Sequence, residues 1–283
     1  WMCDDGRLSY TDVEDETRIR RARVRGPQPS SAPPASRAGG GNAGEVPWDM
    51  AVDAAAERLR QARDMHGAAS LAAVASAHVT NEDLFLFGKF AREVLGVEET
   101  GMIVPAWEPD GFLIQAEKAP NAAGARAIGI GGAEEARNIL ARCAKGEVKA
   151  LLVLGADLLG ADDGEKVLAA LEHVETIVCV DTHESEISRL AHIVLPAQSF
   201  AEKDGTLTNA GGRVQRIRPA IRPVGEALPE WEILSRIAAR MGARFPCSTP
   251  REVLKELAGA VPVFAGVSLE SVGTHGVPLS RRA

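Results

Sequence analysis

Polar residues follow two apolar segments of this sequence, residues 150–154 and 176–180, at the point where each segment ends. In open α/β sheets, ligands bind in the crevice outside the carboxyl ends of the strands. A glycine there lets a ligand approach the backbone, and a carboxylate accepts hydrogen bonds from ribose hydroxyls. A sheet whose strand ends only pack explains the same pattern more simply. The candidates for a nucleotide crevice are Gly155 and Asp157 after the first segment, and Asp181, Thr182 and Glu184 after the second.

Acid–base chemistry is a second interpretation of the stretch around His183. The imidazole is flanked by Asp181 and Glu184, and all three groups can transfer protons. Acidic and hydroxyl side chains are also typical of the solvated first turn of a helix, and we favour that interpretation. The spacing assembles no Ser/His/Asp or Cys/His arrangement, and no phosphate-binding loop or dinucleotide fingerprint follows a long strand.

The four cysteines are Cys3, Cys143, Cys179 and Cys247, and none belongs to a C-x-x-C pair. Their spacing suits neither a disulfide framework nor a self-contained zinc or cluster site, so a reducing cytoplasmic setting is expected. A net charge of −7 argues against general affinity for nucleic acid or anionic lipid. The apolar runs are shorter than the ~20 residues of a membrane helix, so no direct membrane insertion is expected.

The segments that carry the strand-end residues belong to an alternating unit over residues 132–196. Continuous apolar strands separated by amphipathic helices are typical of a parallel sheet that is covered on both faces. We expect helices at 133–145, 163–172 and 184–191, and strands at 150–154, 176–180 and 193–195.

Further elements are expected on both sides of this unit. A capping box at Thr80 and Asp83 begins a helix that ends at Gly96. Residues 106–131 look irregular, 202–215 form a Gly-rich segment, and the end of the chain has no clear pattern. The other expected elements are a helix from Trp48, strands at 68–75 and 102–105, and helices at 229–241 and from Thr249.

The first part of the chain differs in composition from the rest. Residues 1–26 are polar and contain five arginines between 18 and 25, which indicates a solvated strap or, alternatively, a surface that docks an acidic partner. Residues 27–44 are rich in Pro, Ser, Ala and Gly and predict a mobile linker, which limited proteolysis should cut first.

One segment resembles a known superfamily. Residues 195–215 read LPAQSFAEKDGTLTNAGGRVQ and are similar to the E-x-D-G-T-x-T-N-x-x-G-R-V-Q block of the molybdopterin oxidoreductases. Residues 181–196 resemble the preceding block, with His192 where an acidic residue is usual, and 46–51 resemble the entry helix. The resemblance implies an α/β fold with a Rossmann-like parallel sheet of the molybdopterin oxidoreductase type and a helical C-terminal segment. It also implies that Gly155, Asp181, Thr208, Asn209 and Arg213 face a pterin or nucleotide crevice.

Two stretches narrow the resemblance to the 75 kDa-type iron–sulfur subunit of NADH–quinone oxidoreductase. Residues 1–10 look like its C-D-x-G-R-x-x-Y stretch, in which the cysteine is the last of four ligands to a 4Fe–4S cluster. Residues 110–125 are similar to its K-x-P-N-x-x-G-A block. The chain also begins inside the first motif, so we expect a C-terminal fragment in which Cys3 lacks its upstream partners and the isolated chain is colourless.

The resemblance implies a part of an electron-transfer subunit that passes electrons from NADH towards quinone, with a vestigial pterin fold as scaffold. No molybdenum and no complete active site are then expected. Its partners would be the other subunits of the peripheral arm, at the cytoplasmic face of the cell membrane. The alternatives are a fragment of a molybdenum-dependent oxidoreductase such as formate dehydrogenase, and a nucleotide-binding α/β module. The expected division is a strap at 1–26, a linker at 27–45, an α/β domain at 46–245 and a C-terminal helix and tail at 246–283.

Overall fold

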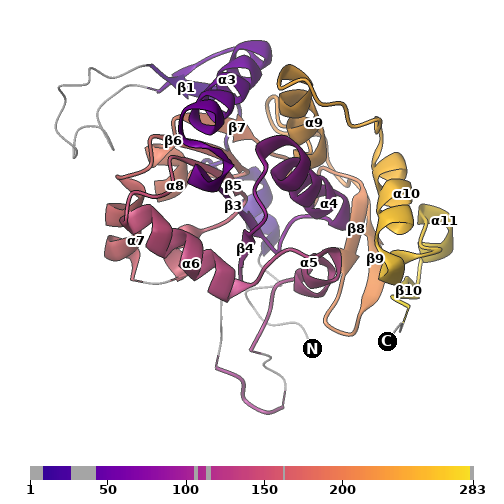
Figure 1. Ribbon diagram of the computed structural model, residues 1–283. Helices are drawn as coiled ribbons and strands as arrows, with labels where there is room; N and C mark the ends of the chain where they lie inside the picture. The colour runs from indigo at the N-terminus through magenta and orange to yellow at the C-terminus, as the bar shows by residue number, and fades with distance from the viewer. Residues whose placement is uncertain (1–8, 27–42, 105–107, 113–115, 162, 281–283) are drawn as a thin grey trace.

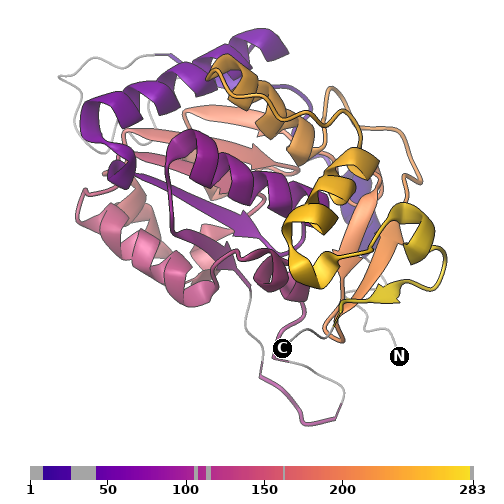
Figure 2. The ribbon, with the colours of Figure 1, turned by 45° about the vertical axis from the view of Figure 1, so that its right-hand side comes forward.

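The fold is a layered α/β arrangement (Figures 1 and 2), seen in a computed structural model that describes residues 9–26, 43–104, 108–112, 116–161 and 163–280. Cys3 and most of the linker predicted at 27–44, namely residues 27–42, lie outside the described residues. In the described part of the chain, no helix combines the length and apolar character that a membrane crossing requires.

A seven-stranded sheet with the order β2-β1-β7-β6-β5-β3-β4 forms the centre of the molecule. The five strands from β7 to β4 are mutually parallel, which confirms the parallel sheet predicted around residues 150–195. At the other edge β1 runs antiparallel to β7, and β2 runs antiparallel to β1. The bounds are β1 (Arg23–Arg25), β2 (Ala43–Glu45), β3 (Leu71–Ser76), β4 (Thr100–Ile103), β5 (Ala150–Leu154), β6 (Thr176–Asp181) and β7 (Ile193–Pro196).

Helices cover both faces of this sheet because alternate strand residues point to opposite sides. Leu152 and Leu154 join one core cluster with the first group of helices, whereas Leu151 and Val153 join the other with the second group. The first group is α3 (Trp48–His66), α4 (Asn81–Lys89) with a π-helical continuation at Phe90–Leu95, α9 (Glu230–Arg240) and α10 (Pro250–Ala260). The second group is α6 (Ala133–Ala144), α7 (Gly164–Leu171) and α8 (Glu186–Leu190).

A small antiparallel sheet occupies the Gly-rich segment. It has the order β10-β9-β8, with bounds β8 (Gly205–Thr208), β9 (Arg213–Ile217) and β10 (Val277–Pro278). The sequence pattern predicted none of these strands. The prediction that residues 106–131 are irregular is wrong at α5 (Ala122–Ile128). At the end of the chain, where the sequence has no clear pattern, the structure has the short helix α11 (Leu269–Val272).

The arginine strap is part of the fold. β1 extends the parallel sheet, with Arg23 opposite Val194 in the register. Arg18 and Arg25 are buried, so the expectation of a solvated strap is wrong at both positions. Their burial requires partners, since an unpaired charge in the protein interior is costly. Part of the predicted linker, Ala43–Glu45, is strand β2.

Candidate functional site

A cavity of about 550 Å³ lies at the carboxyl ends of β3, β5, β6 and β7. The chain runs from β3 to β4 on one side and continues at β5 on the other side of β3, so the cavity lies at the switch point of the sheet. The lining includes Gly155, Asp181 and Thr182 from the predicted set. It also includes Asp12, Val13, His78, Val79, Pro120, His183, Ala197, Gln198, Ser199, Phe200, Lys203, Leu207, Ile217 and Glu230.

Gly155 forms the cavity floor where β5 ends. Its φ is +59°, in the left-handed region that favours glycine, and its N–H donates to the Val180 carbonyl at 2.8 Å. A Cβ at this position would contact the Val79 side chain at 3.4 Å, which is an ordinary distance. The glycine is therefore explained by backbone conformation and leaves bare backbone facing the cavity.

Asp181 supplies a carboxyl group at the end of β6. Burial raises its pKa to about 6, although the Thr182 N–H donates to the carboxylate at 2.7 Å and opposes that shift. Near neutral pH the group is therefore mostly ionised, and it accepts hydrogen bonds from a ligand. Below its raised pKa it becomes a donor.

His183 joins this strand end to the N-terminal strap. Its Nε2 lies 2.7 Å from the Asp12 carbonyl, so Nε2 carries the proton that is donated. Its Nδ1 then accepts from the Thr182 hydroxyl at 2.8 Å. Glu184 points elsewhere, because it forms an ion pair with Arg23 at 2.7 Å and accepts from the Ser188 hydroxyl. The acid–base grouping of Asp181, His183 and Glu184 is thus only partly brought together.

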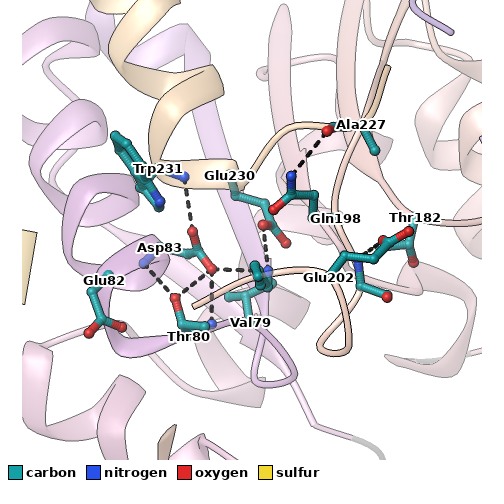
Figure 3. Close-up of polar contacts among 12 residues, drawn as sticks. Val79, Thr80, Glu82, Asp83, Thr182, Gln198, Glu202, Ala227, Glu230 and Trp231 are labelled. Atoms are coloured by element: carbon teal, nitrogen blue, oxygen red, sulfur yellow. Dashed lines mark hydrogen bonds and ion pairs between the residues drawn. The ribbon is translucent and has the colours of Figure 1, made fainter. Parts of the chain in front are cut away.

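A buried charge cluster adjoins the cavity, since its members Lys203 and Glu230 line it. Figure 3 shows the contacts of Asp83 and Glu230 in this cluster. The Lys203 ammonium lies 2.5 Å from Glu230 and 3.1 Å from Asp83, and all three side chains are at most 5% exposed. Asp83 also accepts from Thr80 in the α4 capping box and from the Trp231 N–H at 2.9 Å, so it caps two helices.

The pKa values of this cluster follow from burial and pairing. Burial alone would lower the pKa of Lys203, but the two carboxylates hold it above its usual value. Burial, and then the neighbouring Asp83, raise the pKa of Glu230 to about 7. Lys203 is therefore a fixed cation whose charge is compensated inside the protein.

Ser199 offers an unused polar group to the cavity. The residue is 7% exposed, and its Oγ has no hydrogen-bond partner among the residues that the structure describes. Its N–H, in contrast, donates to Glu202 at 2.7 Å. A buried hydroxyl without a partner costs free energy, and a ligand in the cavity would satisfy it.

The remaining predicted site residues do not line this cavity. Thr208 is buried, with its N–H donating to Asn121 at 2.7 Å, and Asn209 stabilises the turn of the β8–β9 hairpin. Arg213 donates to the carbonyls of the loop before β10. Asp157 is exposed and caps the turn after β5.

The cysteines and His192 have structural surroundings. Cys143 and Cys179 are fully buried core residues, as predicted, and burial raises the pKa of the Cys143 thiol to about 12. The Cys247 thiol donates to Glu256 at 3.1 Å. His192 accepts from the Ile177 N–H, and burial lowers its pKa to about 4, consistent with the structural role predicted for it. Within the described ranges, no group of three metal-ligating side chains occurs.

Sequence comparison identifies the family. A family model described as molybdopterin oxidoreductase matches residues 97–240, about half of the chain. The chain belongs to the molybdopterin oxidoreductase family. This match contains three of the four strands that end at the cavity, β5, β6 and β7, and also the block from Glu202 to Asn209 that was quoted for the resemblance.

Several relatives that match this chain are named as formate dehydrogenases or as other oxidoreductases. The chain is 41% identical over 134 residues to an F420-dependent formate dehydrogenase 2 subunit alpha of Methanococcus maripaludis, which is 46% of this chain and 20% of the relative. It is 40% identical over 126 residues to a putative formate dehydrogenase of Staphylococcus haemolyticus, covering 44% and 13%. It is 38% identical over 124 residues to the NADPH-Fe(3+) oxidoreductase subunit alpha of Geobacter sulfurreducens, covering 44% and 15%. The matched segment thus spans a fifth or less of these relatives' length.

A solved structure shares the fold. Acetylene hydratase from Pelobacter acetylenicus superposes with a TM-score of 0.58 over 95% of this molybdopterin oxidoreductase chain and 67% of the other chain. The identity is 12%, so this likeness shows the fold alone. It agrees with the predicted fold class.

Proposed function

We propose that this chain is part of a molybdenum-dependent oxidoreductase of the formate dehydrogenase kind, in which it holds the nucleotide end of the pterin cofactor. The cavity at the switch point of the sheet carries this proposal. Identity of about 40%, over less than half of this chain, to two proteins named as formate dehydrogenases supports the alternative that the sequence left open, in preference to NADH–quinone oxidoreductase.

The cavity residues fit an uncharged, hydrogen-bonding part of such a cofactor. Gly155 exposes backbone, Asp181 accepts from N–H or hydroxyl groups, and the Ser199 hydroxyl lacks a partner among the described residues. The lysine of the lining, Lys203, is already compensated by two carboxylates, so it does not offer a free charge to a phosphate. When bound, the cofactor supplies the metal that exchanges electrons with the substrate. The residues of this chain bind and orient its nucleoside.

The test uses the intact protein that contains this chain. Elemental analysis should find stoichiometric molybdenum or tungsten together with a pterin nucleotide, and the protein should reduce a dye with formate. The variant Asp181→Asn should retain about tenfold less nucleotide, because it loses one charge-assisted hydrogen bond. Asp157→Asn, an exposed control, should retain it all. An intact protein that contains iron–sulfur clusters but no molybdenum, tungsten or pterin would refute the proposal.

A second candidate is the electron-transfer subunit of NADH–quinone oxidoreductase. The C-D-x-G-R-x-x-Y stretch that begins at Cys3 favours it. So does the block at 110–125, in which the Asn121 side chain donates to Val79 and accepts from Thr208. In that case the expected cofactor is the 4Fe–4S cluster, and the expected partners are the other subunits of the peripheral arm. The expected location is the cytoplasmic face of the cell membrane. Iron without molybdenum or tungsten, with quinone reduction by the assembled complex, would support this candidate.

A further inference from the structure

The strap at residues 9–25 forms one side of the cavity. Asp12 and Val13 line it directly. Backbone hydrogen bonds join the strap to the loop after β6, since the Ile19 N–H donates to Thr182 at 2.9 Å and the Glu184 N–H donates to Thr17 at 2.8 Å. The strap and this loop therefore form one continuous wall.

Arg18 connects three segments behind this wall. Its Nε donates to the Thr182 carbonyl at 3.2 Å, its Nη1 donates to the Val13 carbonyl, and its Nη2 donates to Glu202 at 2.6 Å. The Arg18 and Glu202 side chains are 0% exposed, and neither belongs to the cavity lining. A different nitrogen of the planar guanidinium reaches each acceptor, which the single nitrogen of a lysine ammonium cannot do.

Glu202 extends the connection to Ser199 in the cavity lining. One of its oxygens accepts from the Ser199 N–H, and the other accepts from the Val224 N–H at 2.7 Å. Val13, Thr182 and Ser199, three residues that line the cavity, are therefore each bonded directly to Arg18 or to its carboxylate partner. A shift of the guanidinium would move all three together.

We propose that Arg18 is a positioning residue that sets the affinity of the cavity for the cofactor's nucleoside without touching it. This inference rests on the proposed function of the cavity. Residues that hold a binding site must themselves be fixed by a second layer of contacts, because a displacement of about 1 Å loses hydrogen bonds to the ligand. Arg18 and Glu202 supply that layer for Val13, Thr182 and Ser199.

The experiment compares Arg18→Lys with a matched control, Arg216→Lys. Both arginines pair with a carboxylate, and Arg216 bonds Asp204 at 2.7 and 2.8 Å without lining the cavity. Guanosine, the nucleoside that the superfamily resemblance implies for the cofactor, serves as the probe in calorimetric titrations of the 283-residue chain. Arg18→Lys retains the charge but cannot reach three acceptors, so we expect the Kd for guanosine to rise about tenfold. A tenfold change corresponds to the loss of one hydrogen bond to the ligand.

The readouts separate positioning from simple stability. Thermal melting is measured for both variants, and Arg216→Lys should leave the guanosine Kd unchanged. If Arg18→Lys does not fold, Glu202→Gln keeps acceptor oxygen for Ser199 and should weaken guanosine binding in the same direction. An unchanged Kd in a folded Arg18→Lys protein that is only less stable would overturn this inference alone. A wild-type chain that binds no guanosine would overturn the proposed function, and the role of Arg18 with it.

Discussion

Replacement of Lys203 by methionine tests the buried charge cluster most directly. The substitution keeps an unbranched side chain of similar length but removes the ammonium that lies 2.5 Å from Glu230 and 3.1 Å from Asp83. Both carboxylates then remain buried without a cation. Asp83 still accepts from Thr80 and Trp231, whereas Glu230 loses the side-chain donor that holds it.

The expected loss of stability is about 3–5 kcal/mol at pH 7, the cost of removing one partner from a buried ion pair. The loss should depend on pH. The pKa of Glu230 is already raised to about 7, and without Lys203 it rises further, so the folded state binds a proton that the unfolded state releases. The free energy of unfolding of the Lys203→Met protein should therefore fall as the pH rises, by about 1.4 kcal/mol per pH unit for one proton.

Urea titrations at pH 5.5, 7 and 8.5 measure these differences. Lys203→Met combined with Glu230→Gln should recover part of the stability and remove most of the pH dependence that Lys203→Met adds, because a neutral amide does not bind a proton on folding. Lys255→Met changes an exposed lysine and should cost less than about 0.5 kcal/mol. A loss below about 1 kcal/mol for Lys203→Met, or the same loss at all three pH values, would refute the reasoning.

Three further predictions concern other buried contacts. Burial raises the pKa of Glu82 to about 8, so its contribution to stability should decline between about pH 5 and 8, and Glu82→Gln should flatten the stability profile measured by urea titration. Parallel profiles for the two proteins would contradict this. A Cβ at Gly124 would lie 2.1 Å from a buried asparagine oxygen, whereas Gly259 has open space. Gly124→Ala should therefore lower the Tm, while Gly259→Ala should stabilise by about 0.5–1 kcal/mol; equal effects would be evidence against this packing. Gly225 has a φ of +61°, and a Cβ there would lie 2.4 Å from the Arg20 carbonyl oxygen. Gly225→Ala should therefore loosen the strap and speed the hydrogen exchange of its amides. Unchanged exchange rates would count against this contact.

Periodicity predicted the elements whose own residues form a repeating apolar face. β5, β6 and β7 and the helices between them appear where the apolar runs indicated, because burial on both faces leaves a continuous signal. α5 was missed because its sequence, AAGARAI, is short and contains a glycine, so its stability comes from distant contacts. One of these is the Asn121–Thr208 hydrogen bond, which joins residues 87 positions apart.

The candidate site was predictable only where chain topology alone brings residues together. Gly155, Asp181 and Thr182 reach one cavity because carboxyl ends of parallel strands share one edge of a sheet. Lys203 could not be assigned from sequence, because its partner Asp83 is 120 residues away and its own segment shows no regular pattern. The arginine strap was misjudged for the same reason, since burial of Arg18 depends on Glu202.

The distance along the chain between Arg18 and Glu202 has a consequence for folding during synthesis. The two residues are separated by 184 positions, and β1 likewise pairs with a strand formed much later. At about 5–20 residues per second, the ribosome releases the strap roughly 10–40 s before its carboxylate partner exists. Through that interval Arg18 has no carboxylate partner and β1 has no neighbouring strand β7, so the strap cannot dock. The cavity, whose lining extends to Glu230, is therefore completed only after most of the domain has left the ribosome.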